Sequence, residues 1–318
     1  IHFGAEQIDA VELNPATADL LRGKYAEYTS NLTDRPEVNY VVGDGRSYLA
    51  KSDIDYDLIW FVAPDSYAAS NAASSGAFVL SESYLYTREM IEESLGHLAT
   101  DGMVVMQFGE VDYEARPNRT ARLAATARSA YENGEFGEVT DNVVVVTTAE
   151  PPVFDFPAYD SDYPYDVRAI SDDRPFFWHF TPFWDVIGDV GDSISTFDLE
   201  AGIGERVLVV LLVMSILMAA VFLLLPFVLV RDTWKQLPYK ANTAPIFAIL
   251  GLAFIAFEIT LIQRFSLVLG YPTYSLTVTL MAILLSTGVG ALVSERWHHT
   301  PRRMLGALAV AIVGLGLL

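Results

Sequence analysis

Two acidic side chains near the start of the chain are spaced as the carboxylates of a nucleoside site are. Glu12 lies in an apolar run at residues 8–13, and Asp44 stands between two glycines, Gly43 and Gly45, 32 positions later. A carboxylate has two acceptor oxygens, so an acid at the end of a strand can accept hydrogen bonds from both hydroxyls of a ribose. The pattern predicts Glu12 on the ribose and Asp44, with Gly45, at the base.

The Gly-rich turn that brings backbone close to such a ligand normally lies about twenty residues before the acid. Only eleven residues precede Glu12. The chain also opens on Ile1 and closes on Leu318 inside an apolar run. We therefore expect a fragment of a longer protein that lacks the first strand and the Gly-rich loop of this domain.

Four more polar residues are candidates for contact with a substrate. Asp65 and Gln107 follow or end apolar strands, and ligands of open α/β sheets bind at the carboxyl ends of strands. Glu82 and the Tyr86 hydroxyl lie in the next segment. Structural interpretations remain open: Asp65 as a turn cap, Glu82 as an acid in the first turn of a helix, and Gln107 as a structural amide.

Strands and helices alternate through residues 1–150, which we expect to form the nucleotide-binding domain. The predicted strands are 8–13, 38–42, 56–62, 103–108 and 142–148, and the predicted helices are 15–28, 82–98 and 119–131. Residues 56–62 are almost continuously apolar, which is typical of a parallel strand buried on both faces. The alternation predicts an α/β fold with a doubly wound, mostly parallel, Rossmann-like sheet.

Net charge divides the chain near residue 206. The part up to there has a net charge of 13 − 37 = −24, and the remainder has 7 − 3 = +4. So acidic a domain argues against nucleic acid as a partner. Lysine is rare while acids are abundant, which is typical of proteins that work in high salt. The chain has no cysteine, and its five histidines lack metal-ligand spacing, so we expect no disulfide and no metal centre.

Apolar runs predict a transmembrane domain at residues 205–318, with three complete helices and a fourth that is cut short. The spans are 207–230, 245–270, 273–293 and a last one from 304. The first has 24 uncharged residues, which as a helix of about 36 Å exceeds the bilayer core of about 30 Å. Residues 151–204 are a Pro- and aromatic-rich juxtamembrane segment that forms an interfacial belt or packs on the sheet.

The second span contains two charged residues, Glu258 and Arg264. Together they cost roughly 5 to 7 kcal/mol in the bilayer, so Glu258 is expected to face other helices. Because six residues place the two charges about 240° apart around a helix, they are not natural partners. They form a predicted intramembrane polar site.

Basic residues follow the first and third spans, which places both of these loops in the cytoplasm and the acidic domain outside. Nucleotide donors are scarce outside cells, however, and long domains obey the charge rule poorly. We therefore expect a multi-pass protein of the cell membrane whose soluble domain is cytoplasmic, against the charges of its loops.

Four runs of sequence resemble the spermidine synthase family, relatives of the class I S-adenosylmethionine-dependent methyltransferases: Val11-Glu12-Leu13-Asn14-Pro15, Val42-Gly43-Asp44-Gly45-Arg46-Ser47-Tyr48-Leu49, Tyr56-Asp57-Leu58-Ile59 and residues 102–107. Three more runs resemble, more narrowly, membrane-bound spermidine synthase-like proteins: Leu80-Ser81-Glu82-Ser83-Tyr84-Leu85-Tyr86-Thr87, Asp172-Asp173-Arg174-Pro175-Phe176-Phe177, and Glu258-Ile259-Thr260-Leu261-Ile262-Gln263-Arg264 through Gly270-Tyr271-Pro272-Thr273-Tyr274. The resemblance implies that Glu12 holds the ribose of S-adenosylmethionine or its decarboxylated form and that Asp44 contacts the adenine.

The same resemblance leaves the acceptor side incomplete. Of the two aspartates that serve the amine in this family, the first falls on Val62 and the second on Asp65. Valine can neither accept a proton nor orient an ammonium group, so Asp65 is the remaining candidate catalytic residue. The expected function is membrane-anchored aminopropyl or methyl transfer to an acceptor such as a cationic amine, which an acidic cleft would attract. The alternative is a non-catalytic module in which nucleotide or polyamine binding regulates a transporter or sensor.

Overall fold

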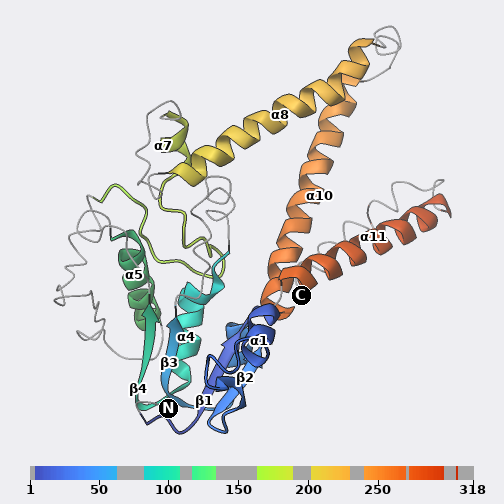
Figure 1. Ribbon diagram of the computed structural model, residues 1–318. Coiled ribbons are helices and arrows are strands. Elements are labelled where there is room, and N and C mark those ends of the chain that lie inside the picture. Colours follow the sequence, from blue (N-terminus) through green and yellow to red (C-terminus); the bar gives the residue numbers. More distant parts are fainter. Residues whose placement is uncertain are drawn as a thin grey trace. The chain divides into compact units, whose positions relative to one another are not determined.

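The structure, a computed structural model, is described at residues 4–62, 82–107, 117–133, 163–188, 202–229, 240–269, 272–296 and 306. The chain divides into two compact units, Ile1–Leu237 and Pro238–Leu318. All of the described strands belong to the first unit, and the second consists mainly of two long helices (Figure 1). The two units are considered separately below.

The strands form two parallel pairs, β1 (Ile8–Glu12) with β2 (Val38–Val42) and β3 (Tyr56–Val62) with β4 (Leu98–Gln107). Helices lie between successive strands in the chain, namely α1 (Pro15–Arg22), α2 (Gly45–Leu49) and α4 (Arg88–Gly96). The expected α/β domain followed by helical segments is therefore confirmed.

Side chains link the two pairs of strands. The Tyr56 hydroxyl, at the start of β3, donates to Asp9 Oδ2 at 2.9 Å, and Asn39 of β2 donates to Asp9 Oδ1 at 2.8 Å. Tyr48 of α2 borders this network, and burial, with the nearby charge of Asp9, raises the pKa of Tyr48 to about 12. Asp9 thus joins β1 both to its partner strand and to the second pair.

Helix α1 begins where its sequence predicts but ends early. The Asn14 side chain accepts the Ala16 N–H at 2.9 Å, and Pro15 occupies the first turn, where its missing N–H costs nothing. The helix stops at Arg22 instead of continuing to residue 28. Gly23 follows, and Ser30 and Asn31 adopt left-handed backbone conformations, so turns replace the predicted last part of the helix.

The predicted helix at residues 82–98 is wrong at its start. A short 3₁₀ helix, η3 (Tyr84–Tyr86), comes first, and α4 starts only at Arg88. Thr87 caps α4, because its Oγ1 accepts the Met90 N–H. Glu82 therefore lies before both helices and is not an acid of a helix's first turn.

Strand β4 begins five residues before the predicted Met103. The Asp101-Gly102 pair lies inside this strand as an irregularity, where the register with β3 shifts. Asp101 has a φ of 65°, and a Cβ at Gly102 would lie 2.8 Å from the Tyr56 carbonyl oxygen. Close backbone approach therefore requires glycine at position 102.

Strand β3 is partly buried on one face and exposed on the other, so the prediction of burial on both faces is wrong. Leu58, Trp60 and Val62 alternate along the strand and therefore share a face, and they are 48%, 55% and 58% exposed. An apolar sequence indicates that a strand can be buried, but it does not indicate which element, if any, packs on each face.

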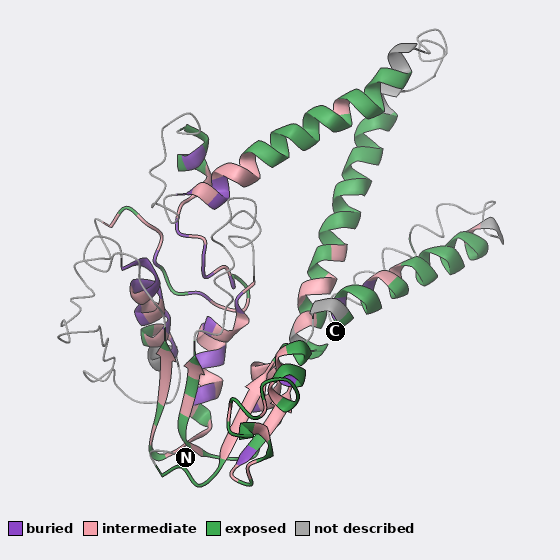
Figure 2. Ribbon diagram, viewed as in Figure 1, coloured by how far each residue is buried: buried purple, intermediate pink, exposed green. Residues whose placement is uncertain are grey.

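The aromatic segment 163–188 supplies much of the core of the first unit. Phe177 lies 4.8 Å from the Tyr86 ring and 5.3 Å from the Trp178 ring, measured between centroids. These residues form one cluster with Ala121 of α5 (Asn118–Asn133), and Figure 2 shows the buried residues of α4, α5 and the segment. The aromatic residues of this cluster pack on η3 and α5, and the cluster includes no strand residue, so the predicted packing on the sheet is not seen here.

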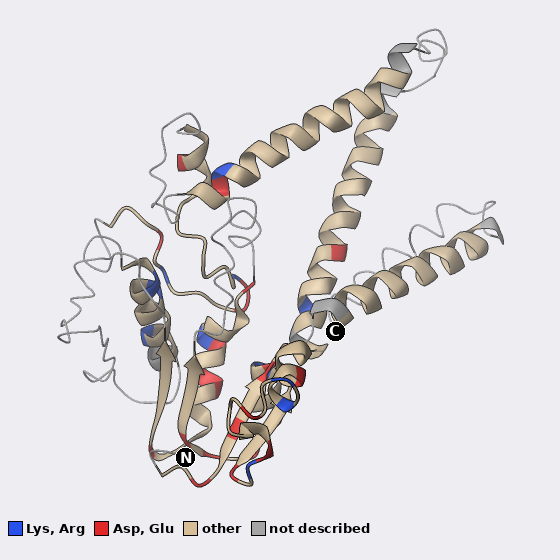
Figure 3. Ribbon diagram, viewed as in Figure 1, with Lys and Arg blue, Asp and Glu red and all other residues tan. Residues whose placement is uncertain are grey.

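Three helices are long and apolar enough to cross a membrane. They are α8 (Ile203–Leu229), α10 (Lys240–Leu269) and α11 (Pro272–Arg296). Most of their residues are exposed (Figure 2), and charged residues are sparse along them (Figure 3). These helices are compatible with a membrane protein. The predicted fourth span and the predicted strand at 142–148 lie outside the described residues, apart from Gly306.

Candidate functional site

Each parallel pair brings two of the predicted positions together at its carboxyl end. Glu12 lies opposite Val42, and the Gly43 N–H donates to the Glu12 carbonyl oxygen at 3.0 Å. Val62 lies opposite Gln107. The acid of β1 therefore neighbours the Gly-Asp-Gly turn, and Val62 neighbours the amide of Gln107.

Glu12 is held by the turn that follows its strand. Its Oε1 accepts the Asn14 N–H at 2.7 Å, while Asn14 itself caps α1. The second carboxylate oxygen makes no hydrogen bond within the described residues. One oxygen of Glu12 thus orients the carboxylate, and the other can accept a hydrogen bond from a ligand.

Asp44 is held in the same way. It is the N-cap of α2, and its Oδ1 accepts the Ser47 N–H at 2.8 Å. Its backbone is extended, as is usual for an N-cap. Neither acid is therefore simply a solvated loop residue. Each carboxylate uses one oxygen to close a turn, and its second oxygen can accept a hydrogen bond from a ligand.

The two glycines beside Asp44 are not required by packing against the described part of the chain. A Cβ at Gly43 would lie 3.9 Å from Val41 Cγ1, and one at Gly45 would lie 3.8 Å from Leu85 Cδ2. Both distances are ordinary van der Waals contacts, and neither glycine has a positive φ. They differ in this from Gly102, whose missing side chain the fold itself demands.

An ion pair joins the start of α2 to the aromatic segment. Arg46 Nη1 and Nη2 donate to Asp172 Oδ1 and Oδ2 at 2.6 and 2.5 Å. Thr87 Oγ1 also donates to Asp172 Oδ1, at 2.8 Å, and the Asp172 N–H donates to Glu89 Oε2 at 2.9 Å. Burial alone would lower the pKa of Arg46, but the hydrogen bond and charge of Asp172 raise it. We call Arg46, Asp172 and Thr87 the joint.

Glu82 and Tyr84 lie next to the joint. Glu82 is hydrogen-bonded to the Tyr84 hydroxyl, and burial, followed by the charge of Glu82, raises the pKa of Tyr84 above its usual range. The Arg46 guanidinium lies 6.0 Å from the centre of the Tyr84 ring. Tyr86, the predicted substrate contact, is 0% exposed and belongs to the core; the accessible tyrosine of this motif is Tyr84.

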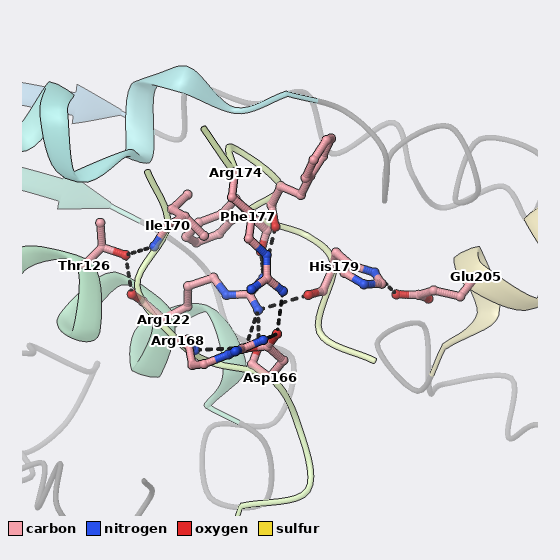
Figure 4. Close-up of polar contacts among 10 residues, drawn as sticks. Arg122, Thr126, Asp166, Arg168, Ile170, Arg174, Phe177, His179 and Glu205 are labelled. Carbon is pink, nitrogen blue, oxygen red and sulfur yellow. Dashed lines mark hydrogen bonds and ion pairs between the residues drawn. The ribbon is translucent and has the colours of Figure 1, made fainter. Parts of the chain in front are cut away.

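A second polar centre, the Arg122 clamp, holds the aromatic segment against α5 (Figure 4). Arg122 is 2% exposed and donates to four backbone carbonyl oxygens of the segment. Nη1 donates to Phe176 and Phe177 at 3.1 and 2.6 Å, and Nη2 to His179 at 2.9 Å and to Asp166. Burial lowers the pKa of Arg122 to about 10, so the side chain remains charged at neutral pH.

The Asp166 carboxylate completes the clamp. It accepts hydrogen bonds from Arg168 at 2.9 and 2.8 Å and from Arg174 at 2.9 Å. Burial alone would raise the pKa of Asp166, but hydrogen bonds from Arg168 and the charge of Arg122 hold it below its usual range. Arg122 Nη1 and Nη2 and the Asp166 carboxylate are all used within the protein, although the buried Arg122 Nε has no hydrogen-bond partner among the described residues. The clamp is therefore structural.

The aromatic segment also reaches the first apolar helix. His179 Nδ1 lies 3.0 Å from Glu205 Oε1, in the first turn of α8, and the His179 ring stacks on Phe183 of α7 (Phe183–Gly188). One continuous segment therefore contacts the Gly-Asp-Gly turn, through Asp172 and Arg46, and the start of α8.

Some predicted residues lie elsewhere. Asp65 falls outside the described residues. Glu258 and Arg264 belong to α10, in the second unit. In the described part of the chain, no group of three or more His, Asp or Glu side chains is arranged to hold a metal ion.

Sequence spacing did not identify the joint or the clamp. Arg46 and Asp172 are separated by 126 residues, and Arg122 and Asp166 by 44. The one available signal was that Arg46 and Asp172 both stand in runs that resemble the same family.

Comparison with known proteins gives no independent assignment. No protein-family model matches the chain, and no curated protein matches it. Its function is therefore argued from the geometry of the strand ends together with the motif runs.

Proposed function

We propose that the first unit binds S-adenosylmethionine or decarboxylated S-adenosylmethionine at the carboxyl ends of β1 and β2, as the donor of a membrane-anchored, spermidine synthase-like transferase. The observation that carries the proposal is that the carboxylates of Glu12 and Asp44 are held in the same way. Each carboxylate is oriented by a backbone N–H through one oxygen and keeps a second oxygen for a ribose hydroxyl or an adenine amino group.

The glycines support this proposal. Neither backbone conformation nor packing explains Gly43 or Gly45. A ligand that lies against the turn does explain them, since any side chain there would occupy its place. The predicted contact of Gly45 with the donor follows from the same reasoning.

The doubly wound sheet is part of the proposal. The pairs β1–β2 and β3–β4 are parallel and are not hydrogen-bonded to each other, but Asp9 and Tyr56 bridge them. We infer that one more parallel strand lies between β1 and β3, giving a single sheet with the order β2, β1, inserted strand, β3, β4. The donor would then lie at the switch point of such a sheet, where its ligands bind.

The acceptor would lie at the carboxyl ends of β3 and β4, beside Val62 and Gln107. In aminopropyl transfer the amine nitrogen forms a bond to carbon, the carbon–sulfur bond breaks to leave a thioether, and the amine proton passes to a base. Val62 cannot be that base, so the proposal assigns it to Asp65, with Glu82 and Gln107 as substrate contacts. Methyl transfer has the same balance of bonds and is the other form of the reaction.

A second candidate function is a non-catalytic sensor, and two observations favour it. A valine that is 58% exposed stands where a base is expected, and the aromatic segment connects the turn at Asp44 to α8. In this function, nucleotide or polyamine binding regulates a transporter or sensor formed by the apolar helices. For both functions we propose a multi-pass protein of the cell membrane with the soluble domain, residues 1–150, on the cytoplasmic side, although the loop charges favour the opposite side.

Donor binding is tested by Glu12→Gln and Asp44→Asn in the full chain. Both amides keep the acceptor oxygen that closes the local turn, but they replace the second oxygen by a donor. We expect each variant to lose about tenfold or more in affinity for labelled S-adenosylmethionine or its decarboxylated form, because one hydrogen bond to a charged group contributes about 1.5 to 3 kcal/mol.

The matched control is Glu27→Gln, which makes the same change at an exposed position and should bind as the wild type does. Wild-type affinity in both site variants would refute the nucleoside pocket. Turnover of bound donor with an amine acceptor would identify a transferase, whereas binding without turnover would identify the sensor.

A further inference from the structure

The second unit contains an acidic side chain deep in an apolar helix. The apolar stretch of α10 runs over Thr243–Ser266, and Glu258 lies 266 − 258 = 8 residues from its nearer end, about 12 Å along a helix. Arg264 lies only two residues, or about 3 Å, from that end, close enough for its long side chain to reach the membrane surface. Of the two charged residues, only Glu258 is far from water in a bilayer.

Glu258 makes no hydrogen bond and no ion pair within the described residues. The other charged residues of α10 and α11 are Lys240, Arg264, Glu295 and Arg296. Arg264 is rotated about 240° from Glu258, and the remaining three lie at the far ends of their helices. An ionised carboxylate at this depth costs roughly 2.5 to 3.5 kcal/mol, and no cation in the two helices offsets that cost.

Helix α11 carries buried hydroxyl groups where it meets α10. Ser275 and Thr279 lie one turn apart and are both 0% exposed. The Ser275 hydroxyl donates to the Ile262 carbonyl oxygen of α10 at 2.5 Å. Thr279 Oγ1 is buried and has no hydrogen-bond partner within the described residues.

The Ser275–Ile262 contact sets the register of the two helices. Helix α11 starts where α10 ends, so the two run away from a common end (Figure 1). Glu258 lies one turn farther from that end than Ile262, and Thr279 lies one turn farther from it than Ser275. Glu258 and the Thr279 hydroxyl therefore each lie one helical turn beyond the Ser275–Ile262 contact.

We propose that Glu258 is a proton-binding site within the membrane and that the Thr279 hydroxyl is its hydrogen-bond partner. A proton from water adds to a carboxylate oxygen, which forms an O–H bond and leaves a neutral acid; release reverses the step, and no other bond changes. The hydroxyl accepts from the neutral acid and donates to the carboxylate, so it can serve both states. The site does not depend on nucleoside binding by the first unit.

Dicyclohexylcarbodiimide tests this proposal, because it enters membranes and reacts with protonated carboxyl groups. We expect the full-length protein in liposomes to be modified at Glu258, as identified by peptide mass spectrometry, with a rate that falls as the pH is raised because only the protonated acid reacts. Glu258→Gln should lose the modified peptide. Thr279→Val should change the rate at least about twofold, which corresponds to about 0.4 kcal/mol.

Thr260→Val is the matched control, because the Thr260 hydroxyl donates to the Ala256 carbonyl oxygen of its own helix at 2.8 Å. It should leave the rate unchanged. An unmodified Glu258 in the wild type, or a rate that is independent of pH, would overturn the proposal. Protection by sodium ions at constant pH would overturn it as well, because the site would then hold a metal cation.

The pairing with Thr279 is tested by cross-linking, which is simple because the chain has no cysteine. Glu258→Cys combined with Thr279→Cys should be joined by a short thiol-specific cross-linker in membranes. Glu258→Cys combined with Thr277→Cys is the control, since two residues turn a helix by about 200°. Equal cross-linking of both pairs would refute Thr279 as the partner.

Discussion

Arg46 and Arg122 both fasten the aromatic segment to the first unit, but they use different partners. Arg122 is buried and donates to four backbone carbonyl oxygens, whereas Arg46 is partly exposed and pairs with one carboxylate. The pKa of Arg122 is lowered by burial, and that of Arg46 is raised by Asp172. A clamp on the backbone fixes the course of the chain, while a partly exposed ion pair beside the Gly-Asp-Gly turn can respond to a ligand.

The largest effect is expected from the clamp. Arg122→Met keeps an apolar stem but leaves four carbonyl oxygens without their donor, and breaking such a buried centre costs about 3 to 5 kcal/mol. Arg122→Lys should recover only part of this loss, because an ammonium cannot reproduce the planar fork of a guanidinium. Hydrogen exchange of segment 163–188 in the detergent-solubilised full chain measures both; unchanged protection in Arg122→Met would contradict the structural role.

Acid should weaken the clamp. The folded-state pKa of Asp166 is lowered from 3.8, so its contribution is fully present above that pH and is lost as the pH falls below it. We expect a loss of about 2 kcal/mol of local stability across this acid range. Asp166→Asn should be less stable at neutral pH and show a flatter acid profile in the same exchange measurement; an equally steep profile would assign the acid loss to other groups.

Breaking the ion pair of the joint should destabilise the protein less than breaking the clamp does, and it should also affect the turn at Asp44. Asp172→Asn keeps a hydrogen-bond acceptor but removes the charge, which at a partly exposed pair costs about 1 kcal/mol. We also expect weaker donor binding, because Arg46 lies two residues after Asp44 in α2. Equilibrium binding separates this from the clamp, since Arg168→Gln, a more exposed arginine of the clamp, should leave donor affinity unchanged.

The comparison of joint and clamp also shows where sequence reasoning ends. The start of α1 followed from Asn14 and Pro15, because a cap depends on neighbours in the chain. The positions of Glu12 and Gln107 at strand ends followed from apolar runs. The late start of α4 could not be predicted from its neighbours in the chain, because residues 82–87 bind a distant segment. For example, the Ser83 N–H donates to the Pro175 carbonyl oxygen at 2.7 Å.

The clamp and the joint were beyond prediction for the same physical reason. A buried arginine is stable only with particular acceptors, and these are supplied by chain that is 44 to 57 residues away for Arg122. Spacing within one segment carries no information about such contacts. The exposed face of β3 is similar, because the apolar residues of one strand do not determine which element packs on them.

The smallest effect is expected at alkaline pH, where the region beside the joint should lose local stability and the clamp should not. The folded-state pKa of Tyr84 is raised above 10.0, by burial and then by Glu82, so its contribution is complete below pH 10 and is lost as the pH rises further. Tyr84→Phe should cost about 1 kcal/mol or less at neutral pH, the value of one hydrogen bond, and should remove this alkaline loss at η3. Because the Tyr84 hydroxyl is hydrogen-bonded to Glu82, beside the joint, exchange at Ile170, whose N–H donates to Thr126, should stay unchanged in the variant. Equal alkaline loosening of η3 in the wild type and in Tyr84→Phe would show that the joint responds through another group.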